Sequence, residues 1–327
     1  MLQRNLLQYL LITAKGLAMG AADVVPGVSG GTIAFISGIY EELIETIHKL
    51  DIGFFKVWRK EGFGMAWRTY NLSFLLALGL GIFISILSLA KLIVHLLTSY
   101  PIAVWSFFFG LVLASIVYVG NQITNWRLSS ILALIIASVF SYLITIADPM
   151  GSPDSTWFLF FAGFIAIIAM ILPGISGAFI LLLLGAYTGV MEILTQLVDG
   201  ITRLDFALFS EAFGKVLIFG IGAITGLKIF SKTLNWMFKH HKNLTLAILT
   251  GFMIGALNKI WPWKEILEYR LNHSGEYIPL IERSILPQNF EGDSKWFLAI
   301  VFTIIGFLTI FLLEKLAVNK EKVVSNR

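Results

Sequence analysis

The chain has 327 residues, of which 57% are hydrophobic and 13% charged, and its mean hydropathy is +0.83. Soluble domains contain about 45–50% apolar and about 25% charged residues, so this composition excludes a soluble protein and indicates an integral membrane protein. The net charge of +4, with basic residues at the ends of apolar stretches, argues against nucleic-acid binding, and the lack of cysteine excludes disulfides and thiolate chemistry.

The apolar stretches are long and continuous, which is typical of membrane-spanning helices rather than of a β-barrel. The first stretch begins at Leu6 and leads directly into a polar motif, so no cleavable signal peptide is expected. We therefore predict an all-α polytopic membrane protein.

Two of the apolar stretches are interrupted in the middle by a proline–glycine motif. The motif is "VVPGVSGGTIAF" in residues 6–48 and "MILPGISGAFIL" in residues 157–198. Proline disfavours helix for itself and for the residue before it, whereas glycine permits backbone conformations that other residues resist. Each stretch is predicted to form a re-entrant hairpin of broken helices. Two full crossings are the alternative, because both arrangements place the ends of the stretch on one side of the membrane.

Each hairpin is followed by three apolar stretches near the ~20 residues that cross a bilayer. We predict spans at about 71–98, 101–120 and 130–147 after the first hairpin, and at about 214–238, 244–260 and 295–316 after the second. The polar, tryptophan-containing segment 261–295 is predicted to be an external cap or an interfacial helix with a loop. Basic residues in the loop at 49–68 and in the C-terminal tail place both termini in the cytoplasm.

The two halves of the chain resemble each other. Alignment of Val25–Glu45 with Leu172–Glu192 gives eight identities, and Gly110 in the first half aligns with Gly251 in the second. Because an odd number of crossings separates the hairpins, residues 1–150 and 151–327 are predicted to be repeats of inverted topology, an architecture that recurs in transporters. A duplication retained only for folding is the alternative.

The motif places hydroxyl groups and glycines at the start of a helix. Ser29 is a natural N-cap for a helix beginning at Gly30 or Gly31. A helix N-terminus carries free amides and a positive dipole end, so two facing N-termini favour an anion of phosphate or carboxylate size. Alternatively, the glycines only allow close helix packing. The predicted phosphate-binding residues are Gly27, Ser29, Gly30, Gly31, Thr32, Gly174, Ser176 and Gly177.

Five charged residues are candidates for guiding the ligand or coupling its movement. Lys15 and the aligned pair Lys91 and Lys232 are predicted to attract a phosphate, although lysines near helix ends also extend to the headgroups without such a role. Asp23 and Glu41 are the candidates for ion coupling, through H+ or Na+. The alternatives are that Asp23 pairs with a lysine or caps loop amides, and that Glu41 lies at the interface. No other cofactor and no metal are expected.

The first motif also fits G-x-S-x-G, the pattern of a serine nucleophile. Such a serine needs a histidine within hydrogen-bond reach, and of the five histidines only His95 lies in a predicted span, near its outer end. A duplicated motif suits a symmetric binding site better than it suits a nucleophile. The chain is therefore predicted not to be an enzyme, and an intramembrane serine hydrolase is the less favoured alternative.

The two motifs together resemble a known family. The segments "GAADVVPGVSGGTIAFISGIYEELI" at Gly20–Ile44 and "AMILPGISGAFILLLLGAY" at Ala169–Tyr187 are similar to the prokaryotic polyprenyl-phosphate transporters, over nearly the whole chain. The resemblance implies a flippase that returns the lipid carrier undecaprenyl phosphate from the outer to the cytoplasmic leaflet for cell-envelope polymer synthesis. It also implies proton or cation coupling and a location in the prokaryotic cytoplasmic membrane.

Two points stay open after this resemblance. The second motif continues as "GAYTGVM" and has no equivalent of Glu41, so any role of that residue is not symmetric. The same loops would also serve a transporter or channel for a small soluble anion. A lipid carrier differs in needing a lateral, apolar opening for its tail. The sequence specifies no oligomeric state.

Overall fold

The computed structural model describes residues 4–25, 28–150, 155–271 and 277–325, and this part of the chain is mostly helical. It divides into two compact units, one made of Met1–Ser85 and Pro149–Thr245 and the other of Ile86–Asp148 and Leu246–Arg327. Each unit therefore contains segments of both predicted halves.

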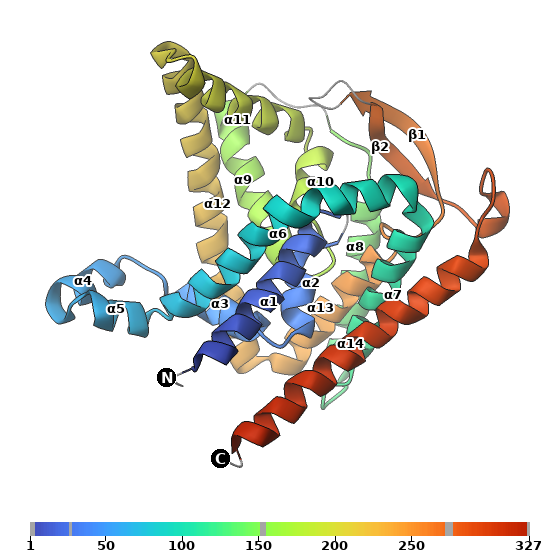
Figure 1. The fold of residues 1–327 in the computed structure, drawn as a ribbon, viewed down its shortest axis with the longest axis horizontal. Coiled ribbons are helices and arrows are strands. Elements are labelled where there is room, and N and C mark those ends of the chain that lie inside the picture. The colour runs from blue at the N-terminus through green and yellow to red at the C-terminus, as the bar shows by residue number, and fades with distance from the viewer. Residues whose placement is uncertain (1–3, 26–27, 151–154, 272–276, 326–327) are drawn as a thin grey trace. The chain divides into compact units, whose positions relative to one another are not determined.

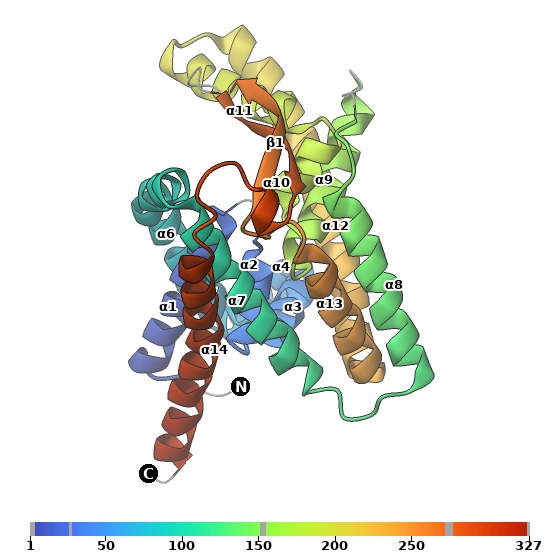
Figure 2. The same ribbon diagram turned by 90° about the vertical axis from the view of Figure 1, so that its right-hand side faces the viewer.

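The first unit contains both proline–glycine motifs. The helix before each motif packs along a later helix of the same half, and α9 and α12 lie side by side in both views (Figures 1 and 2). The helices of this unit are α1 (Leu6–Asp23), α2 (Gly30–Ile36), α3 (Tyr40–Lys49), α4 (Gly53–Glu61), α5 (Phe63–Thr69), the first half of α6 (Leu72–Ser99), α9 (Thr156–Ile171), α10 (Gly177–Leu183), α11 (Tyr187–Thr202) and α12 (Phe206–His240).

Glycines set the close approach of these helix pairs in both halves. A Cβ on Gly16 of α1 would collide with the carbonyl oxygen of Leu78 in α6. In the same way, a Cβ on Gly163 of α9 would collide with the carbonyl oxygen of Phe219 in α12. Small residues that let backbones touch are the usual contact of membrane helices. The helix pair α1–α6 is thus repeated, at aligned positions, by α9–α12.

The second unit contains the remaining helices and a β-hairpin. Its helices are the second half of α6, α7 (Pro101–Gly120), α8 (Leu128–Thr145), α13 (Lys242–Ala256), which begins just before the unit boundary, and α14 (Trp296–Ser325). Gly110 of α7 packs on the backbone of Thr303 in α14, and Gly251 of α13 packs on the backbone of Leu134 in α8. Each of the two aligned glycines therefore contacts the last helix of the other half of the chain.

Four helices in the described ranges are long and apolar enough to cross a membrane, namely α7, α8, α12 and the stretch Leu72–Leu89 of α6. The pair α10 and α11 would form a fifth span if its bend of 110° is counted as a break within one span. This agrees with a membrane protein of several helical spans. Helix α7 has the bounds predicted for the span at 101–120, whereas α12 begins at Phe206, before the predicted start at 214, and α14 ends at Ser325, beyond the predicted end at 316.

The segment 261–295 differs from the prediction. It forms an antiparallel hairpin of β1 (Lys264–Leu271) and β2 (Tyr277–Ser284), followed by the short 3-10 helix η1 (Pro287–Asn289). The prediction of an interfacial helix was wrong here, and the fold is not purely α-helical. Pro279 lies within β2, and a two-stranded hairpin leaves each strand one open edge where proline is tolerated.

A buried lysine of β1 connects the β1–β2 hairpin to α7. The ammonium group of Lys264 lies 3.3 Å from the centre of the Trp105 ring and 3.5 Å from a carboxylate oxygen of Glu282. Burial lowers the pKa of Lys264 to about 8, although the charge of Glu282 acts in the opposite direction. This cation–π contact fixes the base of the hairpin against the helix.

Candidate functional site

Each proline–glycine motif folds as a helix, a short loop and a second helix. Before the first loop α1 ends at Asp23, and after it α2 begins at Gly30 with Ser29 as the N-cap. The hydroxyl of Ser29 accepts a hydrogen bond of 3.1 Å from the amide of Gly31. The predicted helix start at Ser29 is therefore confirmed, while the predicted site residue Gly27 lies outside the described residues. In the second motif α10 begins at Gly177, after Ser176.

The two loops contact each other although they are far apart in sequence. The Ser29 hydroxyl lies within donating distance of two carbonyl oxygens of the second motif, 3.2 Å from that of Met170 and 3.3 Å from that of Leu172. In return, the amide of Gly174 donates to the hydroxyl oxygen of Thr32 at 3.0 Å. Ser29 and Thr32 are both buried, so the two hydroxyl groups join the loops inside the unit.

Tyr40 also connects the two motifs, a contact that the sequence analysis did not predict. Its hydroxyl donates to the carbonyl oxygen of Ile171 at 3.1 Å, and its ring lies 4.9 Å from that of Phe35. The available signal was that Tyr40 is one of the eight identities between the motifs, where it aligns with Tyr187. The start of α3 thus also holds the end of α9.

An acidic side chain occupies the first helix N-terminus. One carboxylate oxygen of Asp23 accepts a hydrogen bond of 2.6 Å from the amide of Gly30. Any side chain at position 30 would collide with this carboxylate, because a Cβ there would lie 2.5 Å from its other oxygen. Of the roles considered for Asp23, capping of a loop amide is therefore the one visible in the fold, and the ion-coupling role stays a prediction.

The second loop lacks these internal partners. Ser176 occupies the N-cap position of α10 but makes no side-chain capping hydrogen bond. The residue aligned with Asp23 is Met170, whose side chain is 46% exposed. Gly174 has a φ of +93°, a conformation that side chains resist, and its amide donates to Thr32 of the first motif. The two loops share a sequence pattern, but among the described residues only the first helix N-terminus receives side-chain caps from its own motif.

The short helices α2 and α10, which follow the two loops, end in the same way. Gly38 and Gly185 occupy aligned positions and have φ values of +71° and +69°. In the first arm the amide of Ile39 donates to the carbonyl of Ala34, and in the second the amide of Ala186 donates to the carbonyl of Leu181. This is the Schellman-type end of a helix, and it repeats bond for bond.

The three predicted lysines lie on different helices and differ in what is described of their side chains. The ammonium group of Lys15 donates to the carbonyl oxygen of Ser37 at 2.6 Å, at the end of α2. Lys232 lies exposed on α12, and Lys91 lies on α6 with its side chain outside the described part. Sequence reasoning missed Lys228, one turn before Lys232, whose ammonium group donates to the carbonyls of Ile47 and His48 at 3.0 and 3.3 Å.

The acidic residues at the start of α3 form ion pairs. Glu41 lies 2.7 Å from Lys242, and both side chains are about half exposed. Its neighbour Glu42 receives two hydrogen bonds from Arg4, at 2.6 and 2.7 Å, and a third from Asn71 at 2.8 Å. These contacts join the start of the chain to the first hairpin, while a coupling role for Glu41 stays a prediction.

The described contacts of the loop serines do not form a nucleophile site. The described partners of the Ser29 hydroxyl are backbone groups of the two motifs and not a histidine. Among the residues with described placement, no group of three histidine, aspartate or glutamate side chains is arranged to hold a metal ion.

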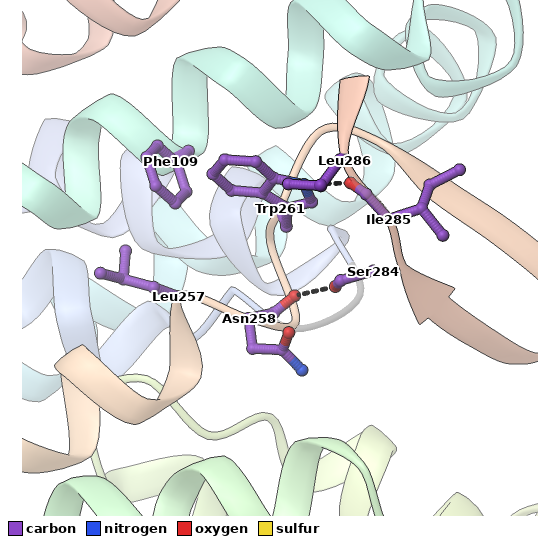
Figure 3. Close-up of a pocket in the computed structure, with 7 residues that line it drawn as sticks. All are labelled: Phe109, Leu257, Asn258, Trp261, Ser284, Ile285 and Leu286. Carbon is purple, nitrogen blue, oxygen red and sulfur yellow. Dashed lines mark hydrogen bonds between the residues drawn. The ribbon is translucent and has the colours of Figure 1, made fainter. Parts of the chain in front are cut away.

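A cavity of about 350 Å³ lies in the second unit, beside α7 and β2 (Figure 3). Two hydrogen bonds join residues that line the cavity. The Trp261 indole donates to the Ile285 carbonyl at 2.8 Å, and the Ser284 hydroxyl donates to the Asn258 carbonyl at 2.9 Å. None of the predicted site residues lines this cavity. We therefore assign it to the place where the β1–β2 hairpin is attached to the helices of the second unit. The lining residues are Phe109, Leu257, Asn258, Trp261, Ser284, Ile285 and Leu286.

Comparison with known proteins gives consistent matches over the chain. A family model described as "undecaprenyl phosphate translocase-like" matches residues 19–278. The chain is 45% identical to a polyprenyl-phosphate transporter of Vibrio cholerae, over 95% of this chain and 98% of the relative. It is 30% identical to a polyprenyl-phosphate transporter of Staphylococcus aureus, over 94% of this chain and 96% of the relative. Both relatives are named as transporters and not as enzymes. No solved structure matches the chain.

Proposed function

The chain belongs to the undecaprenyl phosphate translocase-like family, and on that premise we propose that it transports undecaprenyl phosphate, or a polyprenyl phosphate of the same kind. The names of the two relatives support this substrate class. The direction we propose is from the outer to the cytoplasmic leaflet of a prokaryotic membrane, so that the lipid carrier is reused in cell-envelope polymer synthesis.

The observation that carries the proposal is the contact between the two loops inside one compact unit. Two breaks in apolar helices that meet in this way are where transporters hold an anionic group. We assign the first phosphate contacts to the second loop, because the Ser176 hydroxyl makes no capping bond there and Met170 brings no negative charge. Lys15 and Lys232 add positive charge to the same unit.

Asp23 is proposed to exchange with the substrate at the first loop. Its carboxylate already holds the amide of Gly30, so a phosphate at this N-terminus would meet a negative charge. Two anions at one amide repel strongly where the dielectric constant is low. Phosphate binding therefore requires Asp23 to swing away, to take up a proton or to bind a cation, and this requirement would couple transport to an ion.

The repeated local structure supports an inverted-repeat mechanism of alternating access. Aligned glycines make the same helix contacts in α1–α6 and α9–α12, and the turns at Gly38 and Gly185 have the same hydrogen bonds. If the halves have inverted topology, each loop faces the opposite side of the membrane, and small movements of one half would expose the phosphate alternately.

Depletion in the host cell tests the proposed function. Loss of the protein, with redundant recyclers also removed, is expected to increase undecaprenyl phosphate on the outer surface. Purified protein in liposomes should likewise accelerate the inward movement of a polyprenyl phosphate. Movement of inorganic phosphate without movement of the lipid would identify a small-anion transporter instead, and unchanged surface lipid would reject the proposed direction.

A further inference from the structure

The loop predicted at residues 49–68 folds into two short helices. α4 and α5 follow each other directly and meet at Gly62 (Figure 1). Ring contacts run through both helices, with centroids 6.1 Å apart for Phe54–Trp58 and 5.5 Å apart for Trp58–Phe63 and for Phe63–Trp67. We call α4, α5 and the residue between them the aromatic hairpin. The ring contacts hold its two helices together.

The aromatic hairpin exposes large apolar side chains. In α4 no residue is buried, and the exposed fractions are 58% for Phe55 and 45% for Trp58. In α5 they are 49% for Phe63 and 48% for Met65. A contiguous set of exposed aromatic side chains normally marks a surface that contacts a membrane or a partner.

Basic residues occupy the other side of α4. At about 100° per residue, Phe54, Phe55 and Trp58 fall on one face, whereas Lys56 and Lys60 fall on the opposite face. Arg59 falls at the border between the two faces, next to Phe55. Arg68 in α5 adds a fourth basic residue. A short helix with an aromatic face and a lysine- and arginine-rich face is typical of segments that lie in the headgroup layer of anionic membranes.

The chain connectivity places the aromatic hairpin at the membrane boundary. α5 ends at Thr69, and the apolar membrane-spanning stretch of α6 starts at Leu72. The preceding helix α3 ends at Lys49. Both ends of the aromatic hairpin are thus anchored to segments of the membrane domain, which keeps it within reach of the headgroups.

The second half of the chain has no counterpart of the aromatic hairpin. There α11 ends at Thr202 and α12 begins at Phe206, and residues 203–205 suffice for the turn. The turn exposes one large apolar side chain, Leu204, which is 91% exposed, and the charges of Arg203 and Asp205 cancel. Because the repeated fold does not need the aromatic hairpin, a separate role has to explain it.

We propose that the aromatic hairpin is a binding surface for anionic phospholipid headgroups. Its rings enter the boundary between headgroups and acyl chains, and Lys56, Arg59, Lys60 and Arg68 contact the lipid phosphates. Charge decides the occupant: a patch with four basic residues against the single acid Glu61 suits an anionic surface. This binding does not depend on the proposed transport function.

A single label in the full chain tests this proposal, because the protein contains no cysteine of its own. We would place an environment-sensitive fluorophore on M65C and reconstitute the protein in nanodiscs of phosphatidylcholine alone or of phosphatidylcholine and phosphatidylglycerol in equal parts. The expected result is a blue shift and shielding from an aqueous quencher only in the anionic discs, both reversed by high salt. In a titration, the phosphatidylglycerol content at half-maximal shift should rise about fivefold when one basic residue is changed to glutamine.

Two controls separate lipid recognition from misfolding. The variant K56R/R59K/K60R/R68K keeps the charges and should keep the shift, whereas K56Q/R59Q/K60Q/R68Q should abolish it. A label on L204C, in the turn of the second half, should not respond to phosphatidylglycerol. Equal shielding of M65C in both kinds of disc, or shielding that survives the glutamine changes, would overturn the proposal. So would a label exposed to the quencher in every disc, or shielding that follows self-association of the protein.

Discussion

The first proline–glycine loop supplies its own hydrogen-bond partners, whereas the second depends on the first. Asp23 and Ser29 hold the amides at the start of α2, and Thr32 of the first motif also receives the amide of Gly174 from the second. The N-cap residue of α10, Ser176, makes no such bond. Because both loops have the PG-x-SG pattern, the difference comes from neighbouring residues, above all from Asp23 where the second copy has Met170. Duplication can therefore preserve a backbone turn while changing what it binds.

The largest expected effect comes from filling the contact between the loops. A Cβ on Gly31 would lie 2.6 Å from the carbonyl oxygen of Ile171, so Gly31→Val forces the motifs apart. We expect a loss of more than about 3 kcal/mol in stability, seen as loss of folded protein in a thermal unfolding assay. Gly79→Val in α6, where a Cβ meets no atom within 4 Å, is the matched control and should change stability by less than about 1 kcal/mol. Equal tolerance of both substitutions would contradict the described contact.

Thr32→Val tests the bond by which the first loop holds the second. The change keeps the shape but leaves the buried amide of Gly174 without its acceptor. An unpaired buried amide costs about 1–3 kcal/mol, so a clear decrease in melting temperature is expected. Thr32→Ser retains the hydroxyl and should recover most of the stability. A valine variant as stable as the unchanged protein would contradict a role of this bond in stability.

Exchanging the charges between the loops tests the proposed role of Asp23. Asp23→Asn keeps an oxygen for the amide of Gly30 but removes the negative charge, so binding of a polyprenyl phosphate should become about tenfold tighter, or about 1.4 kcal/mol. Transport by this variant should no longer depend on an ion gradient. Met170→Asp places a carboxylate beside the second loop and should weaken binding by a similar factor. Unchanged affinity in both variants, measured by titration in detergent, would reject the proposal that Asp23 exchanges with the substrate.

The two loop serines should separate stability from binding. Ser29→Ala loses the cap of α2 and the contacts with Met170 and Leu172, so a loss of about 1.5 kcal/mol in unfolding free energy is expected. Ser176→Ala loses no capping bond and should change stability by less than about 0.5 kcal/mol, while weakening phosphate binding several-fold. The reverse pattern would mean that the first loop carries the ligand.

The smallest effect is expected where the two halves are alike. Gly38→Ala and Gly185→Ala each place a side chain at a φ near +70°, which costs about 1 kcal/mol. The two losses, measured by thermal unfolding, should be equal within about 0.5 kcal/mol. Gly64→Ala in α5 is the control, because its φ is not positive and helix propensity makes alanine neutral or stabilising there. Unequal losses at Gly38 and Gly185 would show that the turns are not equivalent.

Local chemistry allowed much of this fold to be predicted. The N-cap at Ser29, the break before Pro173 and a helix over 101–120 all follow from side chains within a few residues, and the structure has all three. The helical character of the aromatic hairpin and the strands of 261–295 were not predicted. Both segments mix charged and aromatic residues without a long apolar period, so their local pattern did not distinguish helix, strand and loop.

The sequence by itself determined the membrane class, the breaks between helices at the two motifs and the residue types of the loops, because these depend on composition and on the backbone preferences of proline, glycine and serine. Only the tertiary structure decided which donor meets which acceptor. In the structure the Asp23 carboxylate accepts a hydrogen bond from the Gly30 amide, and the Thr32 hydroxyl accepts one from the Gly174 amide. The Lys15 ammonium group donates to the carbonyl oxygen of Ser37. The reason is physical: a buried polar group takes the nearest partner that packing provides, and packing joins segments that are remote in the chain.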